Sequence, residues 1–145
     1  MEIKRLIVGM VQTNCYIAVH PETKEAVIVD PGDEAARIED ALAQTGAKAK
    51  AILLTHGHFD HVTAMEELRR DLGVPVYACE QEQAVLADPD KNLSVQFHLT
   101  VWTISHDQPF CTNAFLLIIA KLSQGVVPQR SIEEPHRRFS YLITR

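Results

Sequence analysis

Cysteine is scarce in this sequence, and the few cysteines are dispersed. Cys15, Cys79 and Cys111 lie far apart, and no C-x-x-C pair occurs. Neither a disulfide framework nor a four-cysteine zinc site is therefore expected. The thiols are predicted to be reduced, as in the cytoplasm. Cys15 is expected to be a small buried hydrophobe rather than a nucleophile, because no base lies near it in the sequence.

Basic residues and long apolar runs are also few. The chain has 145 residues, with 14 Lys+Arg against 19 Asp+Glu and a formal charge of −5. Phosphate binding needs clustered Lys and Arg, so no nucleic-acid partner is expected. The longest apolar run, 114–120, is far shorter than the ~20 residues that span a bilayer. The stretch 6–11 is too short for a signal peptide, so the sequence predicts a soluble cytoplasmic protein without a membrane partner.

What is present is the composition of an ordinary globular domain, with 46% hydrophobic and 23% charged residues. The length favours a single domain over 1–145. The composition changes near residue 95. Residues 1–95 contain 9 basic and 16 acidic residues, whereas 96–145 contain 5 and 3, and five of the six glycines precede residue 95.

The distribution of β-branched and apolar residues predicts a mixed α/β order for the first part of the chain. Strands are expected at 3–8, 15–19, 26–29, 49–54 and 75–78, and helices at 34–45, 62–72 and 80–87. Beyond residue 95, 97–104 and 139–143 are predicted to be strands, and 113–120 fits either a buried strand or a helix. This order is a strand meander followed by β-α-β-α, a layered α/β design.

The segment Thr55–His61 carries the chemistry. Its sequence, THGHFDH, holds three histidines and one aspartate at the end of an apolar strand and the start of a helix. His56 and His58 point to the same side if the loop is extended, while Asp60 and His61 can face a second position. Imidazole and carboxylate groups together are ligands for zinc or non-haem iron. Two simpler interpretations are a solvated histidine-rich loop and Asp60 as a helix N-cap.

At these residues the sequence resembles the metallo-β-lactamase-fold hydrolases, and within them the glyoxalase II-like (hydroxyacylglutathione hydrolase-like) branch. Further similar segments are 9–16 (GMVQTNCY), 26–33 (AVIVDPGD), 51–55 (AILLT) and 88–94 (DPDKNLS). The resemblance covers residues 1–95 and implies an αββα sandwich with metal at one edge of the sheets.

The resemblance also implies a ligand set. One metal is held by the counterparts of His56 and His58 with a third, distant histidine. A second metal is held by the counterparts of Asp60 and His61 with a last histidine, and an aspartate and a hydroxide bridge the two ions. Asp60 would also act in catalysis by orienting the hydroxide. Asp30 resembles the family's buried aspartate behind the ligands, which orients imidazoles, although a turn residue in D-P-G is the alternative.

The chain departs from the family after residue 95. The T-P-G-H-T string that supplies the third histidine is absent, and the nearest candidate is His136 in EEPH, for which a surface histidine beside two arginines is the alternative. His98 and His106 are expected in the core or at the surface rather than at the metal. No Asp or His follows His136. Residues 96–145 are therefore expected to be a divergent, truncated or frame-shifted replacement, which leaves the sandwich incomplete in its C-terminal half.

The sequence thus predicts a zinc-dependent hydrolase of thioesters or esters, of the glyoxalase II type, with one or two zinc ions and with iron or manganese as other candidates. Zinc lowers the pKa of bound water to roughly 7 in such enzymes. The expected partner is a small-molecule thioester or ester, and an uncovered apolar sheet face would favour a homo-oligomer. The alternatives are a non-catalytic metal-binding or interaction protein and a mononuclear iron sulfur dioxygenase.

Overall fold

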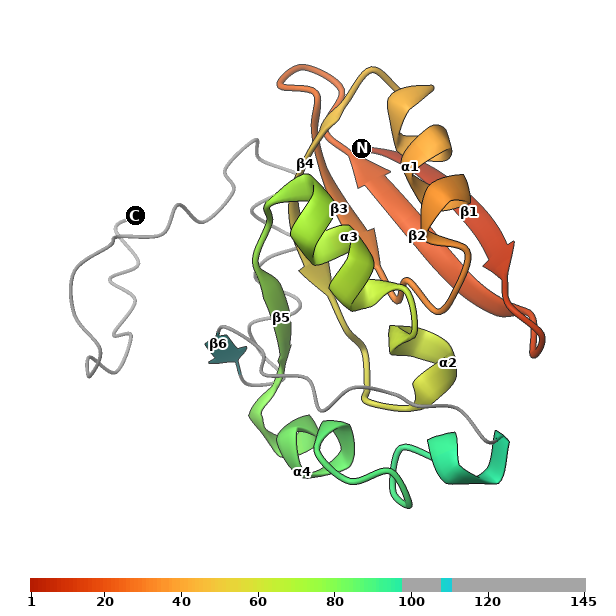
Figure 1. Ribbon diagram of the computed structural model, residues 1–145. Coiled ribbons are helices and arrows are strands. Elements are labelled where there is room, and N and C mark those ends of the chain that lie inside the picture. The colour runs from red at the N-terminus through yellow and green to blue at the C-terminus, as the bar shows by residue number, and fades with distance from the viewer. Residues whose placement is uncertain (98–107, 111–145) are drawn as a thin grey trace, which may run out of the picture.

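One sheet organises the part of the chain described by the computed structural model, residues 1–97 and 108–110 (Figure 1). Its strands follow the order of the sequence: β1 (Glu2–Val8), β2 (Thr13–Val19), β3 (Glu25–Val29), β4 (Lys48–Leu53), β5 (Val76–Cys79) and β6 (Gln108–Phe110). Neighbours from β1 to β3 pair antiparallel, and neighbours from β3 to β6 pair parallel. Short turns suffice for the antiparallel pairs, whereas parallel pairs need helical crossovers.

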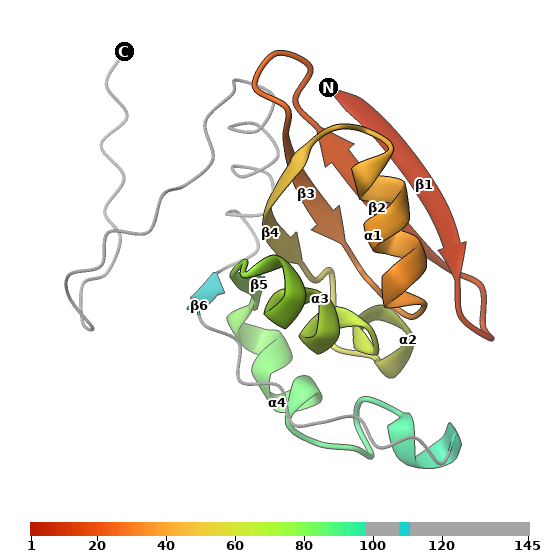
Figure 2. The same cartoon turned by 45° about the horizontal axis from the view of Figure 1, so that its top comes forward.

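Helices α1 (Ala35–Ala43) and α3 (Met65–Leu72) are the crossovers from β3 to β4 and from β4 to β5, and they lie side by side on one face of the sheet (Figures 1 and 2). Ile38 of α1 and Met65 and Leu68 of α3 are fully buried in the core beneath them. Cys15 of β2 belongs to the same core and is 0% exposed. Burial, assisted by the negative charge of Asp30, raises its pKa to about 12. The interpretation of Cys15 as a small buried hydrophobe is therefore confirmed.

The opposite face of the sheet is apolar as well. Strand register places Val27 of β3 beside Ala18 of β2 and Ala51 of β4, and the next row runs from Tyr16 through Val29 to Leu53. Val27 and Leu53 are 0% exposed although they lie outside the helix-facing core. At the edge, Ile3 and Ile7 of β1 are exposed. A sheet that is apolar on both faces is built to be covered on both faces.

The mixed α/β order predicted for residues 3–87 is confirmed, with one correction. The helix expected over 62–72 is two helices, α2 (Phe59–Val62) and α3. The Ala64 amide donates to the carbonyl of Pro31 at 3.1 Å, a contact outside the helix, and this draws the backbone out of the helical ladder. The segment 80–87 forms a 3₁₀ turn, η1 (Glu80–Glu82), and α4 (Gln83–Leu86).

Phe97, expected to begin a strand, lies instead in the 3₁₀ helix η2 (Ser94–Phe97). The remainder of that strand, the segments 113–120 and 139–143, and His98, His106 and His136 lie outside the described residues. The single domain over 1–145 and the divergent C-terminal half stay predictions.

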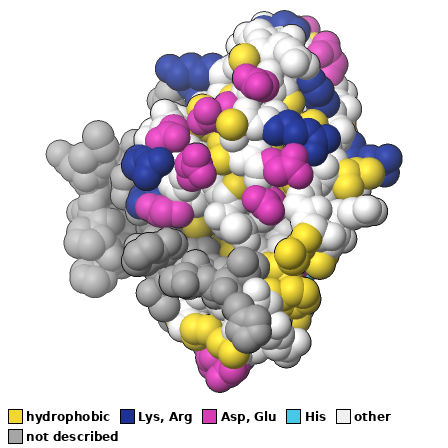
Figure 3. Space-filling model, turned by 45° about the vertical axis from the view of Figure 1, so that its right-hand side comes forward, with side chains coloured by type: hydrophobic (Ala, Val, Ile, Leu, Met, Phe, Trp, Pro, Cys, Tyr) yellow, Lys and Arg dark blue, Asp and Glu magenta, His cyan; other side chains and the backbone are white. Residues whose placement is uncertain are grey.

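Charges of both signs alternate on the outer surfaces of the helices. Arg37 pairs with Glu34 at 2.6 Å, and Arg69 pairs with Glu66 at 2.8 Å. Figure 3 shows the same mixture of Lys and Arg with Asp and Glu side chains on one face of the molecule. Within the described ranges, no helix is long and apolar enough to cross a membrane.

Candidate metal centre

The histidines of the motif gather where β4 ends and α2 begins. The rings of His56 and His58 lie edge to face with their centroids 4.6 Å apart, and those of His56 and His61 are 4.0 Å apart. His58 itself has an extended backbone (φ −67°, ψ 148°), and its ring lies beside that of His56. His61 comes from α2, one turn further along the chain. Three imidazoles from six consecutive residues therefore share one small region.

Asp30 supports this cluster from the end of β3. Its side chain is buried, and its two oxygens accept hydrogen bonds from the amide (2.7 Å) and the hydroxyl (2.6 Å) of Thr55. Oδ2 also lies 3.1 Å from Nδ1 of His61. The backbone of Asp30 has φ of 50°, a left-handed conformation that Asp tolerates in turns. Asp30 is thus both the turn residue and a buried carboxylate behind the histidines.

The Nδ1 atom of His61 is buried and has no hydrogen-bond partner among the residues that the structure describes. The approach of Asp30 is close enough for charge attraction, but the alignment does not make a hydrogen bond. Burial by itself would lower the pKa of His61; the contact with Asp30 and the negative charges of Asp30 and Asp60 outweigh it and raise the pKa. With Nδ1 directed at Asp30, Nε2 faces the Asp60 side, at 3.4 Å from its Oδ2.

Asp60 lies in the first turn of α2, and the interpretation of it as the helix N-cap is wrong. His58 occupies the N-cap position, and no side-chain cap is formed. The carboxylate instead reaches across to β2, where Oδ2 accepts a 2.6 Å hydrogen bond from the hydroxyl of Thr13. Sequence reasoning missed Thr13 because 47 residues separate it from Asp60. The only signal for it was its place in the family-like segment 9–16.

The environment of His56 favours its neutral form. Burial lowers its pKa, and repulsion from His61 and His58 lowers it further. A neutral imidazole is the form that binds a metal ion.

The donor set fits a metal that prefers nitrogen and carboxylate ligands. Within the described part of the chain, however, no three His, Cys, Asp or Glu side chains are already arranged around one cation position. His136, the predicted third ligand, lies outside that part. The described residues alone would therefore supply only part of a coordination sphere.

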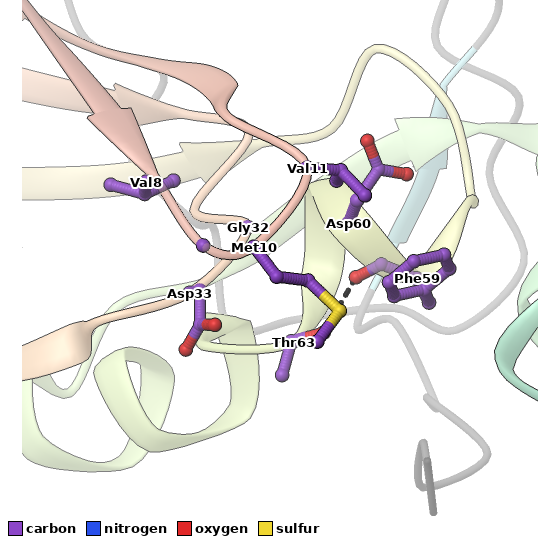
Figure 4. Close-up of a pocket in the computed structure, with 9 residues that line it drawn as sticks. Val8, Met10, Val11, Gly32, Asp33, Phe59, Asp60 and Thr63 are labelled. Atoms are coloured by element: carbon purple, nitrogen blue, oxygen red, sulfur yellow. Dashed lines mark hydrogen bonds between the residues drawn. The ribbon is translucent and has the colours of Figure 1, made fainter. Parts of the chain in front are cut away.

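A small pocket opens beside the cluster, between the β1–β2 turn and α2 (Figure 4). Met10, Val11 and Phe59 give it apolar walls. On its α2 side the hydroxyl of Thr63 donates to the carbonyl of Phe59 at 2.6 Å, and the carboxylate of Asp60 points away from Thr63.

Comparison with known proteins identifies the family. The family model described as the metallo-beta-lactamase superfamily matches residues 8–140. The chain belongs to this superfamily. The resemblance noted in the sequence covers residues 1–95 only. The family model also matches residues beyond 95, up to residue 140.

Two of the known proteins that are similar to this chain are named as hydrolases. The probable metallo-hydrolase YqgX of Bacillus subtilis is 38% identical over 92 residues, covering 63% of this chain and 43% of the relative. The hydroxyacylglutathione hydrolase GloC of Haemophilus influenzae is 35% identical over 86 residues, covering 59% and 40%. The chain therefore spans less than half the length of these relatives.

Solved structures give the same fold. The B3 metallo-beta-lactamase BLEG-1 superposes with a TM-score of 0.62 at 38% identity, covering 74% of this chain and 50% of that one. TTHA1623, solved in a di-iron-bound form, superposes with a TM-score of 0.63 at 30% identity, covering 74% and 53%. The described α/β sheet with helices on one face is thus part of a metallo-β-lactamase fold.

Proposed function

We propose that this protein is a metal-dependent hydrolase of thioesters or esters, of the hydroxyacylglutathione hydrolase type. The observation that carries the proposal is the gathering of His56, His58 and His61 beside Asp60 at one end of the sheet. The similarity to GloC supports the thioester class, because its name states that activity.

The chain's own residues have distinct tasks in this proposal. His56 and His58 would hold one metal ion, and Asp60 and His61 would hold another, with His136 as a further candidate ligand. A bound zinc would supply hydroxide at neutral pH and stabilise the developing oxyanion. The carboxylate of Asp30, 3.1 Å from Nδ1 of His61, would hold the orientation of this ring by charge attraction.

Asp60 would also handle the proton of the attacking water. Thr13 and His61 both engage its Oδ2, which among the described residues leaves Oδ1 for that proton. This arrangement is the reason to place Asp60 in catalysis as well as in metal binding.

Zinc is the expected metal, and iron is the other candidate, because a relative at 30% identity was solved with two irons. A second candidate function is metal binding without catalysis. It is favoured by the absence, within the described residues, of a preformed three-ligand group.

The test combines metal content with turnover. We expect zinc in the purified chain and its loss in the double variant His56→Ala/His58→Ala, measured by elemental analysis. His20→Ala is the control, since His20 lies beyond the opposite end of β2 from Thr13, about 20 Å from the cluster. Equal zinc in the double variant and the wild type would overturn the metal site.

S-lactoylglutathione hydrolysis in zinc-supplemented buffer tests the reaction. Each site has few ligands, and a misplacement of ~1 Å can reduce a rate on the order of 100-fold. We therefore expect weak turnover. It should depend more on His58 than on Asp60, because Asp60 would serve the second metal site, which is expected to be seldom filled. Zinc binding without turnover would favour the non-catalytic alternative, and robust turnover lost equally in His58→Ala and Asp60→Ala would indicate a complete two-metal centre.

A further inference from the structure

The backbone of the ligand loop is tied down at alternate residues. Three amides donate to acceptors on three different segments: Thr55 to Oδ1 of Asp30 (2.7 Å), Gly57 to Oε2 of Glu82 (2.9 Å) and Phe59 to the carbonyl of Asn92 (2.9 Å). His56 and His58 lie between these fixed points. The rings of the two histidines lie together between these fixed points, with their centroids 4.6 Å apart.

Glu82 is the acceptor at the centre of this pattern. It ends the η1 turn, its side chain is partly buried, and it reaches Gly57, the residue between the two histidines. The other two acceptors cannot be removed by a substitution that affects the loop backbone alone. Asp30 also contacts His61, and Asn92 uses a backbone carbonyl.

The segment that carries Glu82 packs directly on the loop. A Cβ atom at position 57 would lie 3.0 Å from Cγ of Leu86 and 3.1 Å from its backbone nitrogen. The absence of a side chain at Gly57 thus lets the loop approach this segment closely enough for the Glu82 carboxylate to accept its amide.

We propose that Glu82 is a positioning residue of the metal site, which holds the loop through the Gly57 amide so that His56 and His58 are presented together. This inference rests on the metal site of the proposed function. Glu82 does not bind the metal itself in this proposal; it acts through the backbone, as groups behind metal ligands do.

The matched variants are Glu82→Ala, Glu82→Gln and, as control, Glu80→Ala, which removes an exposed glutamate from the same turn. The first measurement is the hydrogen-exchange rate of the Gly57 amide in the metal-free full chain, by NMR. We expect at least about tenfold faster exchange in Glu82→Ala, and rates near those of the wild type in Glu82→Gln, because an amide oxygen also accepts a hydrogen bond.

The second measurement is the affinity for Zn²⁺ alone, in competition with a chromogenic chelator. Loss of a group that orients ligands typically weakens metal binding 10- to 100-fold. We expect a loss in that range for Glu82→Ala, recovery to within about threefold for Glu82→Gln, and no change for Glu80→Ala.

Each outcome separates this inference from the proposed function. Zinc binding that is equally tight in Glu82→Ala and Glu80→Ala overturns the positioning role alone, as does Glu82→Gln failing as badly as Glu82→Ala. A Gly57 amide whose exchange is unchanged in Glu82→Ala overturns it as well. Zinc binding without thioester hydrolysis overturns the proposed reaction and leaves the role of Glu82 intact. A wild-type chain that binds no zinc overturns both.

Discussion

At the scale of single residues, Asp30 shows how one side chain at the histidine cluster contacts more than one partner. Asp30 accepts two hydrogen bonds from Thr55 and lies against His61, while its backbone makes the left-handed turn out of β3. Asn would tolerate that backbone, but it offers only one acceptor oxygen. Two acceptor atoms and a tolerance of positive φ are together properties of Asp, which explains this residue at this position.

Opposite pKa shifts in the histidines predict a pH dependence of stability in the metal-free chain. The pKa of His61 is raised by Asp30 and Asp60 against the effect of burial, so protonated His61 stabilises the fold fully below pH about 6.5. That stabilisation is lost as pH rises through the folded pKa. The pKa of His56 is lowered by burial, so its contribution is present above about 6.5 and is lost as pH falls.

Urea unfolding in EDTA at pH 6, 7 and 8 measures the effect. We expect His61→Gln to reduce the fall in the free energy of unfolding above pH 6.5, whereas His56→Gln keeps that fall. An unchanged fall in His61→Gln would contradict the assignment of the raised pKa to this residue.

At the scale of elements, α2 depends on the turn that follows β3. Gly32 packs against α2 so closely that a Cβ atom would lie 1.7 Å from the carbonyl oxygen of Asp60. The Ala64 amide bonds to Pro31 in the same turn. The short helix that carries Asp60 and His61 therefore takes its place from this turn rather than from its own four residues.

We expect Gly32→Ala to lower the free energy of unfolding by more than about 2 kcal/mol, since the clash is with backbone that has to move. Gly46→Ala is the control. Gly46 has φ of +66° and open space around it, so only the backbone strain of about 1 kcal/mol is expected. Chemical denaturation of both variants gives the comparison, and equal losses would refute the close packing at Gly32.

Residue patterns located most elements, and the THGHFDH motif located the ligand segment, but neither reveals the contacts that join these parts. The strands at 3–8 and 26–29 were predictable because they are rich in β-branched residues. The helix at 34–45 was predictable because its apolar residues recur at helical spacing. The break in the helix at Thr63–Ala64 was not predictable, because its cause is a contact of Ala64 with Pro31, 33 residues earlier in the chain. Thr13 and Glu82 were missed for the same reason: a single polar residue carries no periodic signal, and its partner is distant in sequence.

At the scale of the whole molecule, the edge strand β1 exposes apolar side chains on the face of the sheet opposite the helices, and this surface bears on self-association. Ile3 and Ile7 of β1 are 62% and 45% exposed on that face, and Ile3 is in register with buried Ala18 of β2. Exposed apolar surface that continues a buried one promotes association, which is the basis for expecting a homo-oligomer.

Light scattering at increasing protein concentration tests this expectation. We expect association in the wild type and less of it in Ile3→Lys, because the charge would be buried in the contact. Met10→Lys adds the same charge at a residue that is 72% exposed in the β1–β2 turn, away from this face. A monodisperse monomer in the wild type, or an equal effect of the two lysines, would argue against the sheet face as the contact.

The alternate tethering of the ligand loop also bears on transplanting this motif into other proteins. A designer who moves the seven residues Thr55–His61 to a new scaffold carries the donors but leaves behind the acceptors, which come from positions 30, 82 and 92. The grafted histidines would then sample many orientations, and a metal would have to order them on binding. A successful graft would need three further acceptors, each built into a different part of the host, so the smallest portable unit is most of the first 92 residues rather than one loop.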